Sequence, residues 1–359
     1  NMTDPTITQT SSITGATAEK LIHDLVAIPS PSTQEAAAVE HLVNWMQSHG
    51  YDEAFIDDAG NTVGIIGNGA QDILLLGHID TFGGFPEVRL ENRTLYGRGS
   101  VDAKGSLATF AVAAARANLN PDLRLIVVGA VEEEAASSKG ARYIATQYNP
   151  TACFIGEPSA WDRITLGYKG RLLLHWRWHG ALAHSANQIA TPAEHAFAYW
   201  QRIRAYCDEF NADETRIFAT LDPTLQDIAS GQEGAYGWAE MTIGFRIPPG
   251  INPTDLVSDF APTEGATVRA YGIEQAYIGD KNSNISRVMR GAIRAEGGKP
   301  RFVHKTGTSD MNVVAHHWDC PMLAYGPGDS ALDHTPDEHL NLDEYLQAIR
   351  ILTGALERL

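Results

Sequence analysis

The sequence predicts an α/β protein in which a main domain, with a mostly parallel sheet flanked by helices, carries an inserted α+β domain. Up to about residue 172, short continuous apolar runs alternate with helical segments, which is typical of a buried parallel sheet. Beyond that point the strands alternate between apolar and polar residues. From residue 284 a helical pattern resumes. We therefore assign residues 1–172 and 283–359 to the main domain and residues 173–282 to the insert.

In the main domain, residues 18–49 have apolar side chains at helical spacing, with a break at Pro29 and Pro31. Apolar runs predict strands at 63–66, 73–76, 123–128 and 152–155. The remaining periodic segments predict helices at 105–118, 139–147, 284–298 and 342–359. In the insert, strands are expected at 172–180, 235–250 and 266–278, and helices at 192–210 and 253–260.

Composition excludes several classes of protein. The chain has 359 residues and a net charge of -17, which argues against a nucleic-acid or anionic-membrane partner. No apolar run approaches the roughly 18 residues that cross a bilayer, and the N-terminus has neither region of a signal peptide. The cysteines, Cys153, Cys207 and Cys320, are odd in number and far apart, which favours a reducing, cytoplasmic compartment.

Residues that can bind metal or move protons lie in five short segments. His78 and Asp80 stand at i and i+2 in GHIDT, so both side chains point the same way and the carboxylate can orient the histidine ring. Three successive glutamates after the strand at 123–128 are costly unless a cation neutralises them. Adjacent carboxylates also allow one to bind metal while the other transfers protons. The full set is His78, Asp80, Asp102, Glu132, Glu133, Glu134, Glu157 and His334.

Each segment alone has an ordinary explanation, such as a polar loop, a helix N-cap at Asp102, a solvated acidic loop or a structural histidine. Their grouping at the carboxyl ends of strands favours a site, because open α/β sheets place their sites there. The mixture of histidine nitrogen and carboxylate oxygen suits Zn²⁺, with Co²⁺ or Mn²⁺ as substitutes. Three ligand carboxylates facing two such cations leave a positive centre that can polarise a carbonyl and acidify a water.

Eight motifs, in order, resemble the zinc metallopeptidase family of acetylornithine deacetylase, succinyl-diaminopimelate desuccinylase, aminoacylase and carboxypeptidase G. They are GHIDT, GRGSVDAKG, VEEE, GEP, AHSA, FRIPPG, GTSD and DHTPDE, and the resemblance runs from about residue 18 to the C-terminus. It implies two zinc ions bridged by Asp102, and a cis peptide after that residue. The ions would be held further by His78 and Glu157 and by Glu134 and His334. Glu133 would be the general base and Asp80 would orient His78; the alternative register shifts the glutamate roles by one.

The same resemblance implies that residues 173–282 form a lid and dimerisation domain, so that the protein is a homodimer with a separate catalytic domain. His184 of AHSA would then reach the partner's site and stabilise an oxyanion, and Arg246 of FRIPPG would bind a substrate carboxylate. The less favoured alternatives are that His184 is a polar residue at a strand end and that Arg246 belongs to a structural ion pair.

A narrower resemblance rests on GYKGR, EEEAASSKGAR and HKTGTSDMN. These segments resemble hydrolases of the aminoadipate route that free lysine or ornithine from an N-acetyl group or from the C-terminal glutamate of a small acidic amino-group carrier protein. The implied substrate contacts are Lys169, Lys305, Gly307 and Thr308. The alternatives are another acyl-amino-acid deacylase acting on acetylornithine or succinyl-diaminopimelate, a dipeptidase, and a non-catalytic peptide-binding protein. A zinc storage protein is disfavoured, because closed structural sites prefer cysteine.

Overall fold

The computed structural model describes residues 13–184 and 188–359 and divides the chain into two compact units. Unit 1 comprises the described residues up to Leu166, Gly279–Val303 and Val314–Leu359, and unit 2 comprises Gly167–Ile278 and His304–Val313. The segment 304–313 joins unit 2 through long-range hydrogen bonds, such as that from Asn312 Nδ2 to the Lys169 carbonyl at 3.2 Å. The N-terminal segment discussed above, and Ser185 and Ala186 of the AHSA motif, lie outside the described residues.

The sheet of unit 1 is parallel at its centre and antiparallel at its edges. Its order is β1-β2-β6-β3-β7-β15-β8. The bounds are β1 Glu53–Ile56, β2 Thr62–Ile66, β6 Leu123–Ala130, β3 Gln71–His78, β7 Ala152–Gly156, β15 Met322–Ala324 and β8 Arg163–Tyr168. Strand β3 runs parallel to β6 and β7, and β15 runs parallel to β7, whereas β2 and β8 join in antiparallel register. The four strands predicted from apolar runs are β2, β3, β6 and β7, so the predicted fold class is confirmed.

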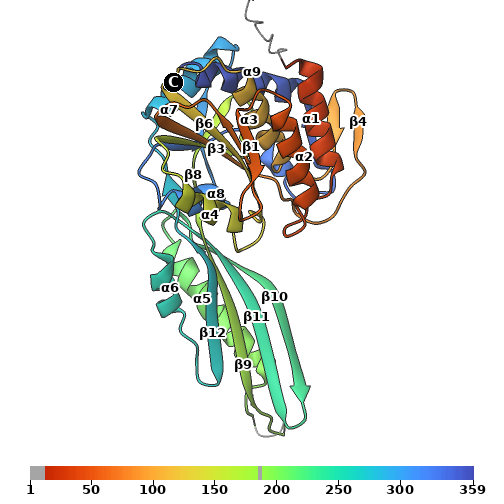
Figure 1. Cartoon of the computed structure of the whole chain (residues 1–359). Coiled ribbons are helices and arrows are strands. Elements are labelled where there is room, and N and C mark those ends of the chain that lie inside the picture. Colours follow the sequence, from red (N-terminus) through yellow and green to blue (C-terminus); the bar gives the residue numbers. More distant parts are fainter. Residues whose placement is uncertain (1–12, 185–187) are drawn as a thin grey trace, which may run out of the picture. The chain divides into compact units, whose positions relative to one another are not determined.

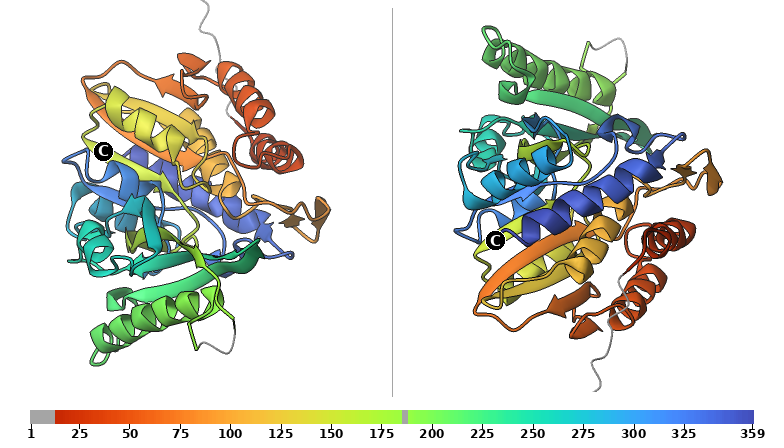
Figure 2. Two further views of the ribbon diagram at one scale, coloured as in Figure 1. Left: turned by 90° about the horizontal axis from the view of Figure 1, so that it is seen from below. Right: turned by 90° about the horizontal axis from the view of Figure 1, so that it is seen from above.

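Six longer helices belong to unit 1. They are α1 Gly15–Ala27, α2 Ala36–Gln47, α3 Lys104–Arg116, α4 Lys139–Gln147, α7 Asn284–Ala295 and α9 Leu342–Leu356. The helical pattern over 18–49 is thus two helices, separated at the proline break. Helix α3 is rich in small residues and packs against β3, β6 and α9 (Figures 1 and 2). Residues Lys104–Ala114 are consequently buried.

Several short elements of unit 1 escaped prediction, because three residues carry no readable period. Strands β4 Arg89–Glu91, β5 Thr94–Tyr96 and β16 His339–Asn341 form a small sheet in the order β16-β5-β4. A 3₁₀ turn, η3, spans Ser330–Leu332, and β14 Arg301–Lys305 pairs with β8. Helix α8, at Asp310–Val314, belongs to unit 2 except for its last residue.

Unit 2 is an antiparallel sheet with helices on one face (Figure 1). The sheet order is β10-β11-β9-β12, with β10 Asp222–Glu233, β11 Tyr236–Ile247, β9 Gly170–Ala181 and β12 Ala266–Glu274. Helix α5 Pro192–Phe210 begins in a capping box formed by Thr191 and Glu194, and α6 Pro253–Asp259 follows later. Two further elements are η2 Ile217–Ala219 and β13 Tyr277–Ile278, which pairs with the end of β8. Alternate residues of β9, such as Leu174 and Trp176, are buried in a core of this unit's own.

No helix among the described residues is long and apolar enough to span a bilayer.

Candidate metal centre

Three parallel strands of unit 1 deliver candidate ligands at their carboxyl ends. His78 is the last residue of β3, Glu157 follows β7, and Glu133 and Glu134 follow β6. Asp102 comes in the loop before α3, and His334 comes after the η3 turn. The site therefore lies where an open α/β sheet normally places one.

The ligand candidates form two groups that share one carboxylate. In the first, His78 Nε2 lies 3.2 Å from Asp102 Oδ1 and 3.6 Å from Glu157 Oε1. In the second, His334 Nε2 lies 3.1 Å from Asp102 Oδ2 and 3.0 Å from Glu134 Oε1. Within each group, one candidate ligand atom from each residue lies within 4.8 Å of the others. Because Asp102 turns a different oxygen to each group, the donors fit two cations bridged by a carboxylate.

Glu133 lies beside the first group and is part of neither. Its Oε2 atom is 3.7 Å from His78 Nε2, and its side chain is 10% exposed. It forms a third combination with His78 and Glu134. Glu134 thus faces His334, whereas Glu133 lies near His78.

Asp80 is hydrogen-bonded to several residues at this end of the sheet. Its backbone carbonyl accepts a hydrogen bond from His78 Nδ1 at 2.9 Å, which leaves Nε2 to face the cluster. Its carboxylate accepts the backbone N–H groups of Glu133 and Glu134, each at 3.0 Å, and the Ser32 hydroxyl at 2.7 Å. Burial alone would raise the pKa of Asp80, but these hydrogen bonds and His78 hold it below the usual range.

Two residues without a recognised motif fix the start of the acidic run. Asn61 Oδ1 accepts the N–H of Val131 at 3.0 Å, and Glu35 Oε1 accepts the N–H of Glu132 at 3.1 Å. Successive backbone N–H groups from 131 to 134 thus each bond to a side-chain oxygen. The sequence offers no local signal for Asn61 or Glu35, since neither is near the glutamates along the chain.

Crowded carboxylates set the protonation of both histidines. Burial by itself lowers the pKa of His78, but Glu133 and Asp102 raise it well above its usual value. Hydrogen bonds with Asp102 and Glu134 raise the pKa of His334 to about 10. Burial raises the pKa of Glu134. A cluster whose carboxylates raise the pKa of both histidines is one in which a divalent cation would find strong compensation.

The loop carrying His334 is held by an aromatic ring and an ion pair. His334 has a φ of 61° and stacks on Phe82, with ring centroids 4.3 Å apart. Arg98 Nη1 lies 2.7 Å from Glu338 Oε2, four residues beyond His334. Arg98 and Glu338 stand inside the motifs GRGSVDAKG and DHTPDE, yet their types alone gave no role. The peptide between Asp102 and Ala103 is cis, as the resemblance implied.

The structure places the predicted substrate contacts in unit 2. Arg246 Nη1 donates to Thr308 Oγ1 at 3.2 Å, and Thr308 Oγ1 donates to the Lys169 carbonyl at 2.9 Å. Lys305 and Gly307 are half-buried, and His184 is exposed.

The predicted role of Lys169 as a substrate contact has to be corrected. Its side chain is fully buried, and the ammonium donates to Asp222 Oδ2 at 2.6 Å, to the Ile217 carbonyl at 2.9 Å and to Thr220. An ammonium has three N–H groups, and all are engaged inside unit 2. Lys169 is therefore a structural cation in this arrangement and does not present its charge to an acyl donor.

Comparison with known proteins agrees with this centre. Residues 74–358 match the description Peptidase family M20/M25/M40. The chain belongs to this peptidase family. A curated relative from Deinococcus radiodurans, named [LysW]-lysine hydrolase, is 45% identical over 95% of this chain and 97% of its own. A relative from Saccharolobus solfataricus, named [LysW]-lysine/[LysW]-ornithine hydrolase, is 29% identical over 95% of this chain and 96% of its own.

Solved M20 structures share the fold. The M20 metallo-carboxypeptidase Sso-CP2 from Sulfolobus solfataricus gives a TM-score of 0.77 at 17% identity, covering 95% of this chain and 98% of its own. The YXEP protein of Bacillus subtilis, described as a dinuclear metal-binding M20 peptidase, gives 0.70 at 12% identity, with 96% and 97% covered. This M20-family chain is a metal-dependent amidohydrolase, and its candidate metal ligands are the residues grouped above.

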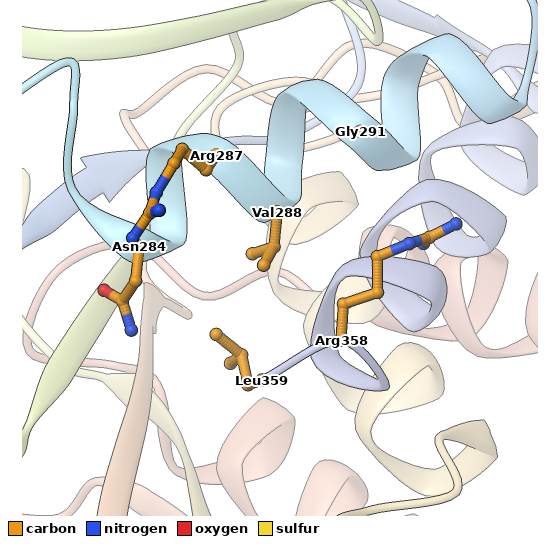
Figure 3. A pocket seen from close by; sticks show the side chains of 6 residues that line it. All are labelled: Asn284, Arg287, Val288, Gly291, Arg358 and Leu359. Atoms are coloured by element: carbon orange, nitrogen blue, oxygen red, sulfur yellow. The ribbon is translucent and has the colours of Figure 1, made fainter.

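A hollow elsewhere on unit 1 is separate from this centre. It has a volume of about 380 Å³ and lies between α7 and the C-terminal Arg358 and Leu359 (Figure 3). Among the described residues that line it, none is a candidate metal ligand.

Proposed function

We propose that this M20-family enzyme hydrolyses an amide bond on the α-amino group of lysine or ornithine, as a step of amino-acid biosynthesis. The observation that carries the proposal is the pair of ligand groups sharing Asp102, with the Glu133 carboxylate beside them. The names of the relatives from Deinococcus and Saccharolobus support lysine and ornithine as the amino acids released. The acyl side is an N-acetyl group or, preferably, a small acidic amino-group carrier protein.

The proposed cofactor is two zinc ions, with cobalt or manganese as substitutes, because histidine nitrogen and carboxylate oxygen suit these metals. His78, Asp102 and Glu157 would hold one ion, and Asp102, Glu134 and His334 the other. When bound, the metal pair polarises the amide carbonyl and acidifies a water.

Glu133 is the proposed general base, and its position supports that role. Its side chain is largely withdrawn from solvent, and Asp80 holds its backbone N–H. The carboxylate takes a proton from the attacking water while the water oxygen bonds to the carbonyl carbon. When the carbon–nitrogen bond breaks, Glu133 returns that proton to the leaving α-amino nitrogen. The products are a free amino acid and a carboxylate.

A substrate comparison tests the proposal. Purified enzyme is assayed for amino-acid release from N-acetyl-lysine, N-acetylornithine, succinyl-diaminopimelate and a carrier-derived peptide whose terminal glutamate is joined to lysine. The Glu133→Gln variant, purified in the same way, shows whether the measured activity comes from this enzyme or from a contaminant. We expect faster amino-acid release from the carrier peptide or the acetylated diamino acids than from succinyl-diaminopimelate. Free dipeptides are assayed alongside, and activity on them alone would refute the proposal.

Salt distinguishes the two acyl donors. The net charge of -17 means that an acidic carrier needs a local basic rim for docking. Such steering weakens when the Debye length falls below about 10 Å, near 0.1 M salt. A salt effect confined to the carrier conjugate supports the carrier, whereas equal, salt-independent rates identify a simple deacetylase.

We further propose a cytoplasmic homodimer in which unit 2 acts as a lid and His184 stabilises the oxyanion in the partner's site. Arg246, Lys305, Gly307 and Thr308 are the proposed substrate contacts. Glu133→Gln and His184→Ala should each be nearly inactive. After subunit exchange about half the dimers are mixed and each has one intact site, so about a quarter of the sites recover. No recovery after verified exchange would place His184 outside the partner's site.

A further inference from the structure

Arg98 and Glu338 form a buried ion pair directly behind the metal centre. The two atoms Arg98 Nη1 and Glu338 Oε2 are 2.7 Å apart, and the side chains are 5% and 0% exposed. The other carboxylate oxygen, Oε1, accepts three backbone N–H groups: those of Gly99 at 3.0 Å, Val101 at 3.1 Å and Asp102 at 3.0 Å. Glu338 therefore fixes the backbone from which the bridging carboxylate projects.

Arg98 extends the same network to the loops on the His334 side. Its Nε donates to the Gly84 carbonyl at 2.8 Å, and its Nη1 donates to the Thr335 carbonyl at 3.0 Å. Thr335 follows His334, and the loop of Gly84 also carries Phe82, which stacks on the His334 ring. Arg98 thus bonds to both of the segments whose rings, Phe82 and His334, stack on each other.

We propose that Arg98 and Glu338 are positioning residues that hold Asp102 and His334 in metal-binding geometry before any metal arrives. The inference rests on the ligand roles proposed above. It deepens them by naming what assembles the site.

Electrostatics explains why such a pair is needed. Four carboxylates, those of Asp102, Glu133, Glu134 and Glu157, crowd around the two histidines, and like charges at this distance repel. Without metal, the loops of Asp102 and His334 would tend to separate, because neither ligand lies in a strand of the central sheet. Replacing a buried ion pair by apolar residues of the same size often leaves a fold equally stable or more stable. What apolar residues lack is the ability to tie three backbone N–H groups and two carbonyls into one arrangement.

Hydrogen exchange on the metal-free wild-type protein gives the first test. If the pair pre-assembles the site, the amides of Gly99, Val101 and Asp102 are protected after metal removal and exchange only by rarer openings. Rapid exchange there, with the sheet amides of β3 and β6 still protected, would overturn the proposal.

Variants give the second test, with metal affinity measured by chelator competition and cobalt absorption spectra. In Glu338→Gln, the amide oxygen can still face the three N–H groups, but its NH₂ group then opposes Arg98. Arg98→Lys keeps the charge and loses the planar fork that spans Gly84, Thr335 and Glu338. We expect each variant to bind metal about 10–100-fold more weakly, as outer-shell changes do, and to alter the cobalt spectrum. The weaker ion should be the one assigned to His334.

Asp72→Asn is the matched control. Asp72 pairs with Arg124 through two contacts of 2.7 and 2.8 Å at the opposite end of β3 from His78. It should lose stability but keep both metals at wild-type affinity. Equal metal loss in the control, or wild-type metal affinity and spectra in both test variants, would leave the pair a purely structural role.

If Glu338→Gln does not fold, Arg98→Lys and the wild-type exchange decide the question. None of these measurements uses substrate. A wrong assignment of the amino acid released therefore does not affect these metal-affinity and exchange results. Likewise, failure of the positioning role proposed for Arg98 and Glu338 does not affect the substrate comparison.

Discussion

Replacing Asp80 by Asn should weaken both the fold and the metal centre, because its two carboxylate oxygens serve donors that an amide cannot serve together. Oδ1 accepts the N–H of Glu133, and Oδ2 accepts the N–H of Glu134 and the Ser32 hydroxyl. Asparagine has one oxygen, so in either orientation its NH₂ group opposes one of the two backbone donors. The Ser32 hydroxyl can rotate and adapt, whereas a backbone N–H cannot.

The magnitude follows from these contacts. One buried N–H without an acceptor costs about 1–3 kcal/mol, and the remaining bonds lose the charge that strengthens them. The free energy of unfolding of the metal-free protein should therefore fall by about 2–4 kcal/mol at neutral pH. His78 also loses the carboxylate 3.4 Å from its Nδ1, so metal affinity should fall about 10–100-fold.

The pH dependence has a definite sign. Because the pKa of Asp80 is lower in the folded chain than its ordinary value, its stabilising contribution is complete above the unfolded pKa of about 3.9. It is lost as the pH falls through the folded value. The difference between wild type and Asp80→Asn should thus be constant near neutrality and shrink in acid.

Urea unfolding of chelator-treated proteins measures the stability, and chelator competition measures the affinity. Asp72→Asn is again the control, since it removes a carboxylate from β3 far from the centre. An Asp80→Asn protein that unfolds at the wild-type urea concentration and binds both metals normally would refute this reasoning.

Three other predictions concern single side chains. Glu133→Gln should keep both metals and lose about 10²–10⁴-fold in turnover, whereas Glu134→Gln should lose metal; exchanged phenotypes, by elemental analysis and kinetics, would mean that the glutamate register is off by one. Since hydrogen bonds with Asp102 and Glu134 raise the pKa of His334 to about 10 in the metal-free chain, metal must displace a proton at neutral pH. Apparent metal affinity should therefore fall as the pH is lowered. Calorimetry in buffers of different ionisation enthalpy should detect proton release on metal binding, and the absence of proton release would contradict the assignment of His334 as a ligand. Lys169→Met should lower the free energy of unfolding by about 2–4 kcal/mol with KM changed less than about twofold, because its ammonium bonds inside unit 2. A raised KM at unchanged stability would restore Lys169 as a substrate contact.

Local sequence was sufficient where an element's signal is local. Helices α4 and α5 have the bounds that periodicity predicted, 139–147 and 192–210, and α5 also carries its own capping box. Strands β3, β6 and β7 were visible as apolar runs because both faces of a parallel sheet are buried. Strand β10 was missed, since the polar segment Asp222–Glu233 is a strand only through its pairing with β11.

The ligand types of the centre were readable in the same way, because each stands in a short motif at the end of an element. Their grouping into two sets that share Asp102 could not be read from any one motif, because the fold has to bring residues 78, 102, 134, 157 and 334 together.

The supporting contacts could not be read, and the reason is distance along the chain. Glu338 acts on Asp102 across 236 residues, and Glu35 acts on Glu132 across 97. Each acts through a backbone N–H, a group that every residue except proline has, so no residue type at the receiving end signals the contact. Lys169 shows the converse. Its sequence indicates a cation near a glycine-rich loop, and only packing decides that this cation is buried against Asp222. The motifs thus determined which chemical groups are present, and tertiary structure decided which of them gather into candidate ligand groups and which hold the others in place.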